Sequence, residues 1–153
     1  AAESMYDHPF QWGSKRTGPD LARVGGKYSN DWHVAHMVDP RSVVPESIMP
    51  GYGFMADREL SYLTMDEHLY TLRQVGVPYT DDQIKSAIAD VNTQANGDNG
   101  DVDAFLARYP KAAVGDFDGN PDKVTELDAL IAYLQILGQM VDFTTYKPEM
   151  NRR

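Results

Sequence analysis

Proline and glycine are unevenly distributed along this 153-residue chain, and their positions restrict its fold more than any other feature. Residues 1–28 carry two prolines and four glycines, and residues 40–53 carry three prolines and two glycines. Proline lacks a backbone N–H, and glycine weakens helices and strands alike. Both stretches are therefore expected to be irregular or extended loops.

A short helix is expected between these two loops. Ser29 or Asn30 offers a side-chain oxygen to the free N–H groups at the start of the helix. Pro40 must end it, because proline removes an N–H that another turn would need.

Two longer amphipathic helices are expected further along the chain. Thr64 with Glu67, and Thr80 with Gln83, have the three-residue spacing of a capping box. Apolar residues recur every three or four positions after each pair. Gly76 is a natural stop for the first of these helices.

The last strong helix signal begins near Thr125 and ends at Gly138. Residues 89–124 are acidic, with room for one or two short helical turns at 102–109. No stretch shows the alternation and hairpin turns of paired strands. The expected class is all-α with long loops, as one domain over residues 1–153. The apolar face of the last helix comprises Leu127, Leu130, Ile131, Leu134 and Leu137.

Composition excludes several kinds of protein. The formal net charge is −9, which disfavours binding to nucleic acid. Apolar runs are too short to cross a bilayer, and the start of the chain does not resemble a signal peptide. The chain also begins without a methionine, so we expect a mature product or a piece of a longer protein. The acidic surface would suit a basic partner, although solubility alone also accounts for it.

The chain contains no cysteine. Disulfides, thiolate metal sites, cysteine nucleophiles and iron–sulfur clusters are therefore excluded within these residues. Covalent haem attachment through a C-x-x-C-H motif is excluded within them for the same reason.

A set of individually weak motifs occurs in a distinctive order. A Gly-Pro turn comes first, followed by a Gly-Lys pair, a short tryptophan-bearing helix, a proline-rich loop with one methionine, and the strong final helix. In this order they resemble the class I cytochrome c fold downstream of its haem-attachment motif. The motifs are Thr17-Gly18-Pro19-Asp20-Leu21, Gly26-Lys27, Asp39-Pro40, Pro45, Met49-Pro50 and Leu130-Ile131-Ala132-Tyr133-Leu134.

A closer resemblance covers nearly the whole chain. Long runs of it are similar to the mono-haem subunit II of cbb3-type cytochrome c oxidases. That family's intact subunit carries an N-terminal membrane anchor and a C-x-x-C-H motif, neither of which is present in this sequence. The stretch 89–124 is longer than the resemblance leads us to expect, so the resemblance implies an acidic insertion there. The runs are 13–29, Asp31-Trp32-His33, Val44 to Pro50, Val75 to Tyr79 and Asp128 to Gln135.

The resemblance implies a set of site residues. Met49 would be the distal axial ligand of a haem iron and the single metal ligand in this chain; a thioether is a soft ligand that raises the reduction potential of haem. Prolines around it would limit the entropy lost in holding so weak a ligand. Contacts with the haem or its crevice would come from Gly18, Pro19, Leu21, Lys27 near a propionate, and Trp32.

The function implied is electron transfer in a respiratory terminal oxidase, at the periplasmic face of the bacterial inner membrane. Haem c is the family's cofactor, and we expect it to be absent from this chain. Partners would be the catalytic haem–copper subunit and the di-haem subunit, with membrane attachment only through an anchor outside these residues. The chain alone is not expected to be catalytic.

Two other functions remain open at this stage. One is a haem-free interaction module on a cytochrome scaffold, favoured by the acidic 89–124 stretch. The other is a metal-dependent enzyme using His33 and His36, although two histidines do not complete a zinc site and are expected to lie at the surface.

Two further expectations concern the second half of the chain. The acidic run that begins at Asp116 fails the EF-hand pattern, because Pro121 and Leu127 stand where glycine and glutamate are needed, so we expect a solvated loop. The face of Leu130, Tyr133 and Leu134 should either self-associate or be covered by residues 89–124.

Overall fold

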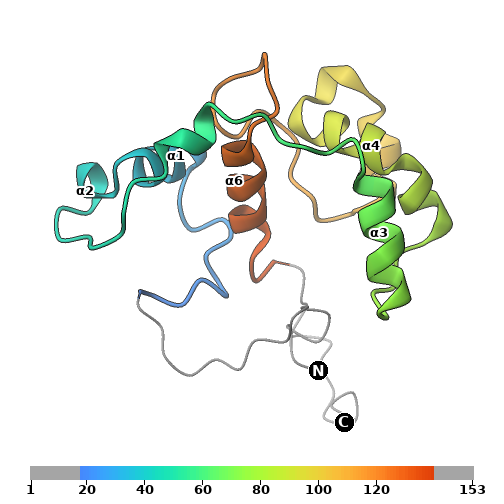
Figure 1. The fold of residues 1–153 in the computed structure, drawn as a ribbon, viewed down its shortest axis with the longest axis horizontal. Helices are drawn as coiled ribbons and strands as arrows, with labels where there is room; N and C mark the ends of the chain where they lie inside the picture. The colour runs from blue at the N-terminus through green and yellow to red at the C-terminus, as the bar shows by residue number, and fades with distance from the viewer. Residues whose placement is uncertain (1–17, 140–153) are drawn as a thin grey trace, which may run out of the picture.

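The computed structural model describes residues 18–139, and their architecture is entirely helical (Figure 1). Six α-helices and two short 3₁₀ helices are joined by long connections, and the one β-contact in this part of the chain is an isolated bridge between Glu59 and Thr125. The all-α prediction is confirmed. The elements are α1 (Asn30–Val38), α2 (Pro40–Val43), η1 (Gly53–Ala56), α3 (Met65–Gln74), α4 (Asp81–Ala95), η2 (Gly97–Asn99), α5 (Val102–Arg108) and α6 (Glu126–Ile136).

Local capping explains where the first two helices begin. Ser29 accepts a hydrogen bond from the Trp32 N–H at 3.2 Å and so starts α1, as predicted. Asp39 then accepts from the Arg41 N–H at 3.2 Å, with Pro40 at the first position of α2. The sequence prediction of an extended loop from residue 40 missed this single turn, which an aspartate cap followed by proline favours.

The helices α3 and α4 pack against each other, and the Tyr62 hydroxyl, in the connection before α3, donates to the Asn92 side chain of α4 at 2.9 Å. The Thr80–Gln83 capping box is present in both directions, so that prediction is confirmed. The Thr64 capping box is wrong, although α3 itself forms. Thr64 has φ −115° and ψ 23° rather than the extended conformation of a cap, and its side chain makes no capping bond.

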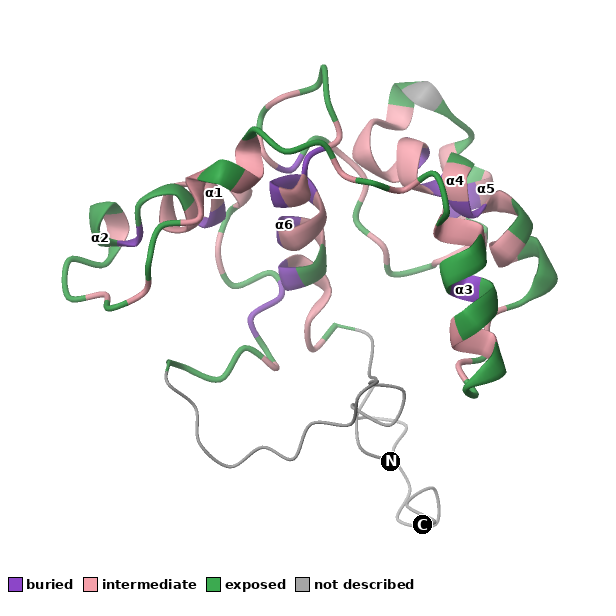
Figure 2. Cartoon of the chain, in the orientation of Figure 1, coloured by how far each residue is buried: buried purple, intermediate pink, exposed green. Residues whose placement is uncertain are grey.

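The core is centred on α6, which lies between the α1–α2 side and the α3–α5 side (Figures 1 and 2). Leu127 and Ile131 of α6 are fully buried, and Phe117 packs with them. Half-buried residues of α1 and η1 complete this cluster, among them Val34, Met37 and Met55. Met37 and Met55 are thus packing residues.

The face of α6 that was expected either to self-associate or to be covered by residues 89–124 is buried only in part. Leu134 is buried, whereas Tyr133 is 58% exposed. A largely apolar groove of ≈ 810 Å³ separates this part of α6 from the helices α3 to α5; Ala87, Phe105, Ala132 and Tyr133 are among its lining residues. Residues 89–124 begin inside α4, and their status as an insertion in a single domain stays a prediction.

No helix within residues 18–139 is both long enough and apolar enough to cross a membrane.

Candidate functional site

The segment that follows the Gly-Pro turn is fastened to the C-terminal end of α6. Gly25 donates to the Leu137 carbonyl and Gly26 to the Gln135 side chain, both at 3.0 Å. Gln135 in turn donates to the Tyr28 carbonyl at 2.9 Å. A Cβ on Gly25 would lie 2.6 Å from the Leu137 carbonyl oxygen and closer still to that of Gln135. Glycine is therefore required here for the backbones to approach.

The Gly-Pro turn itself lies at the surface. Gly18 and Pro19 are exposed, and the Leu21 side chain is 49% exposed. The Leu21 carbonyl accepts from the Val24 N–H at 3.0 Å, which closes a turn and leaves the leucine side chain outside the core. An exposed leucine at this position is available to pack against another apolar group.

Aromatic rings line one face of α1 and the residues just before it. Tyr28 stacks on Trp32 with 4.0 Å between ring centroids, and Trp32 stacks on His36 with 4.7 Å between centroids. The Lys27 ammonium lies 5.3 Å from the Tyr28 ring centroid. Two predicted site residues, Lys27 and Trp32, thus belong to one continuous stack.

His33 is buried inside this cluster, contrary to the expectation of a surface histidine. Only 2% of the residue is exposed, and its ring meets the edges of Trp32 and Tyr28. Burial lowers the pKa of His33, and the nearby His36 lowers it further. The signal was present in the sequence, because His33 lies four residues before the packing residue Met37 and so shares a helix face with it.

The Met49 loop is held at both ends, by a side-chain hydrogen bond at one and a backbone hydrogen bond at the other. Arg41 donates from Nε to the Ser47 carbonyl at 3.2 Å, and the Tyr52 N–H donates to the Met37 carbonyl at 2.6 Å. Between them, the Met49 N–H donates to the Ser47 hydroxyl at 3.2 Å. Met49 is half-buried, while its neighbour Ile48 is 79% exposed. The loop therefore fixes the backbone of Met49 relative to α1 and α2.

The predicted residues form two groups in the described chain. Lys27 and Trp32 are joined through Tyr28, and Met49 is joined to α1 through its loop. No hydrogen bond within residues 18–139 links Met49 to Pro19, Leu21 or Trp32. Their common role stays a prediction.

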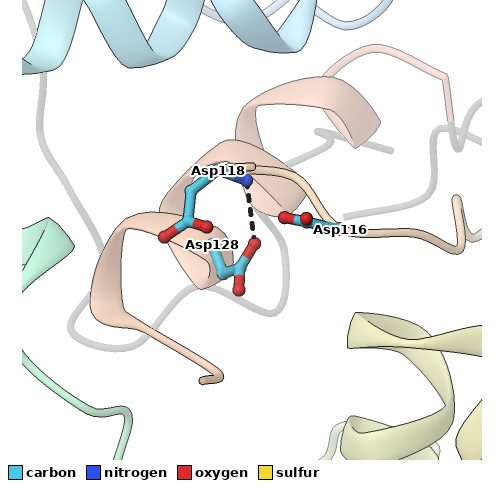
Figure 3. A group of neighbouring side chains, drawn as sticks. All are labelled: Asp116, Asp118 and Asp128. Atoms are coloured by element: carbon cyan, nitrogen blue, oxygen red, sulfur yellow. Dashed lines mark hydrogen bonds between the residues drawn. The ribbon is translucent and has the colours of Figure 1, made fainter. Parts of the chain in front are cut away.

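Two aspartates of the loop before α6 and one in the first turn of α6 form a cluster (Figure 3). The sequence interpretation considered the run from Asp116 but missed Asp128. One carboxylate oxygen from each of Asp116, Asp118 and Asp128 lies within 4.8 Å of the others. Asp128 is buried and accepts from the Phe117 and Asp118 N–H groups at 2.9 and 3.0 Å. The expected solvated loop is therefore wrong at Asp118, which is half-buried and accepts from the Thr125 hydroxyl.

The structural role of this cluster is to hold the loop on α6. Thr125 and Asp128 form a capping box, with 3.0 Å between the Asp128 N–H nitrogen and the Thr125 hydroxyl oxygen. Burial raises the pKa of Asp128, and the neighbouring Asp118 raises it further. The Thr-x-x-Asp spacing, a variant of the predicted capping boxes, is the signal that could have found it.

The fold and the site together define a class of protein. An all-α chain in which the segment after a glycine–proline turn is fastened to the last helix, and a proline-rich loop carries a methionine, has the architecture of a cytochrome c-like protein. Comparison with protein families makes this specific: the family model described as "Cytochrome C oxidase, mono-heme subunit/FixO" matches residues 1–141. The chain belongs to this family, as its resemblance to the cbb3-type subunit II predicted. None of the curated proteins matches the chain.

Proposed function

We propose that this chain is the methionine-bearing portion of an electron-transfer subunit that passes electrons towards a haem–copper catalytic subunit. Family membership establishes the coarser statement, an electron-transfer subunit of cytochrome c oxidase. The observation that supports the specific role is the Met49 loop, tethered to α1 at Met37 and to α2 at Arg41. A thioether held on a fastened loop is what a weak axial ligand needs.

The residues present fit the part of a haem site that this chain would supply. Met49 offers the axial thioether, and the exposed Leu21 and Pro19 offer apolar contact to a ring edge. Lys27 and Trp32 carry hydrogen-bond donors and no acceptors, which suits the carboxylates of a haem. When bound, haem supplies a one-electron couple whose potential the axial ligand helps to set.

Within these 153 residues no thioether bond to a haem can form, because there is no cysteine. We therefore propose that the chain by itself is haem-free and redox-silent, and that it acts as part of a subunit with the attachment motif. Location at the periplasmic face, and contact with the haem–copper and di-haem subunits, belong to the same proposal.

Optical spectroscopy of two samples tests it. The purified 153-residue chain should show no low-spin Soret band, whereas the complete subunit should show one. In the complete subunit, Met49→Ala should abolish the charge-transfer band of a methionine–iron bond in the oxidised state. Met65→Ala on α3 is the matched control and should retain it. A stable Soret band in the short chain would refute its redox silence, and an unchanged Met49→Ala spectrum would refute the ligand assignment.

The competing function, a haem-free interaction module, predicts a different result. Binding of the short chain to the other oxidase subunits would then be independent of haem. Pull-down of those subunits by the 153-residue chain, compared with the haem-loaded complete subunit, separates the two functions.

A further inference from the structure

Two imidazole nitrogens on α1 have no hydrogen-bond partner although they are buried. They are Nε2 of His33 and Nδ1 of His36, and within residues 18–139 they are the only buried side-chain nitrogen or oxygen atoms in this state. Leaving a buried polar atom unpaired is costly, and native structures contain few examples. Two such atoms three residues apart on one helix point to a missing partner.

Within residues 18–139, no acceptor is hydrogen-bonded to either nitrogen. His36 is stacked face to face on Trp32, and His33 meets Tyr28 and Trp32 edge to face. Gln135 of α6, which bonds to the segment before α1, is committed to Gly26, Tyr28 and Asn30. Val34 and Met37 of α1 pack against the apolar core.

The chemistry of the neighbourhood favours a carboxylate over a metal ion as that partner. A metal ion would need further ligands, and in the described part of the chain the one group of three potential ligands is the aspartate cluster, which includes neither histidine. The same face of the molecule instead carries donors, because Lys27 and Trp32 adjoin the histidines through the aromatic stack. Each neutral imidazole adds one N–H donor to that set.

We infer that His33 and His36 donate hydrogen bonds to a propionate carboxylate of the haem and so position it. This inference rests on the proposed function, because the carboxylate is brought by the haem of the complete subunit. It adds two positioning residues to Lys27 and Trp32, and it explains why this region leaves polar atoms unpaired in the chain taken alone.

The inference predicts opposite consequences of one substitution in two states of the protein. In the haem-free 153-residue chain, His33→Phe removes an unpaired polar atom and keeps an aromatic ring, so thermal stability should be unchanged or higher. In the haem-loaded complete subunit the same substitution removes a hydrogen bond to a carboxylate. There the propionate band in the redox-difference infrared spectrum should shift, and the reduction potential should shift with it.

Three further variants make the test selective. His36→Phe should reproduce the infrared shift with less disturbance of packing, because His36 is only half-buried. His36→Gln, which keeps a donor, should restore the band partly. His68→Phe is the matched control, since it removes an exposed histidine on α3 and should leave the band in place.

The possible failures are distinguishable. A complete subunit that binds no haem would overturn both the proposed function and this inference. A haem spectrum that depends on Met49, combined with propionate bands unchanged in His33→Phe and His36→Phe, would overturn this inference alone. Equal destabilisation of the haem-free and haem-loaded forms by His33→Phe, without a band shift in either histidine variant, would reduce the pair to packing residues.

Discussion

The two sides of α6 differ in how completely their buried polar groups are paired. On the α3–α5 side, a buried ion pair joins Asp90 of α4 to Arg108 of α5, and Gln83 reaches across to the Arg108 carbonyl at 3.1 Å. On the α1–α2 side, two buried imidazole nitrogens have no partner. Exposed apolar side chains occur on both sides, with Leu21 and Ile48 on this one and Tyr70 and Val75 on the other.

This difference indicates which side depends on something beyond the described residues. The buried polar groups of α4 and α5 pair with each other through the Asp90–Arg108 contact. The unpaired polar atoms on the other side are groups whose partner a bound molecule would supply. The candidate haem residues were predicted on that second side.

The largest effect should come from breaking the Asp90–Arg108 ion pair on the α3–α5 side. Asp90 is 4% exposed, and Arg108 contacts it through both Nε, at 2.9 Å, and a terminal nitrogen. Arg108→Met leaves a buried carboxylate without its partner, which should lower the free energy of unfolding by about 3 to 5 kcal/mol. Urea unfolding measures it. The double variant Asp90→Leu/Arg108→Met should recover most of the loss, and a single variant as stable as the wild type would show that the pair contributes nothing.

The next effect tests whether the buried residues of α6 stabilise both sides equally. Leu127→Ala removes a fully buried side chain from the core, at an expected cost of about 2 to 5 kcal/mol. Since the core cluster draws on α1 and η1 and not on α3 or α4, the α1–α2 side should unfold first. Hydrogen exchange would then show protection lost in α1 at lower denaturant than in α4. Loss of protection in both helices at the same denaturant concentration would show that the two sides unfold together.

A smaller effect is expected where the site segment meets α6. Gly25→Ala forces a methyl group against the Leu137 and Gln135 carbonyl oxygens, so either segment must shift. Overpacking of this kind should cost about 1 to 3 kcal/mol. Gly18→Ala is the control, because a Cβ there meets nothing within 4 Å. Thermal unfolding compares them, and equal midpoints would mean that the close approach to α6 is not required.

The sequence predicted local features of the structure better than contacts between distant segments. Helix starts at Ser29, Thr80 and Thr125 follow from local capping chemistry, which a sequence contains directly. The Met49 loop was predicted by its prolines and by family resemblance. Its tethers to α1 and α2 depend on which residues meet after folding, so the sequence could not specify them.

The wrong predictions share one physical cause. His33 was expected at the surface and Asp118 in solvent, because polar residues usually lie there. Tertiary packing overrides that tendency when a turn places the residue against the core, as Asp118 and Asp128 do around Thr125. Thr64 failed as a cap in a similar way, since the connection from Leu60 to α3 sets its backbone angles.

The smallest effect should appear only when the pH is lowered. The pKa of His33 in the folded chain lies below its ordinary value of 6.5, because the ring is buried and His36 is close. The unfolded chain therefore binds a proton at His33 more readily than the folded chain does. Stability that is present above pH 6.5 should decrease progressively as the pH falls towards the lower, folded-state pKa.

Urea unfolding between pH 5 and 8 measures this decrease, and His33→Phe should remove part of it. Comparison with His68→Phe separates the effect of burial from the loss of an imidazole, because His68 is exposed on α3. If His33→Phe and His68→Phe give the same pH profile, burial of His33 does not cause the loss of stability in acid. A flatter profile for His33→Phe alone means that a buried, unpaired imidazole destabilises the haem-free chain in acid. A group bound to that imidazole would relieve the same cost in the complete subunit.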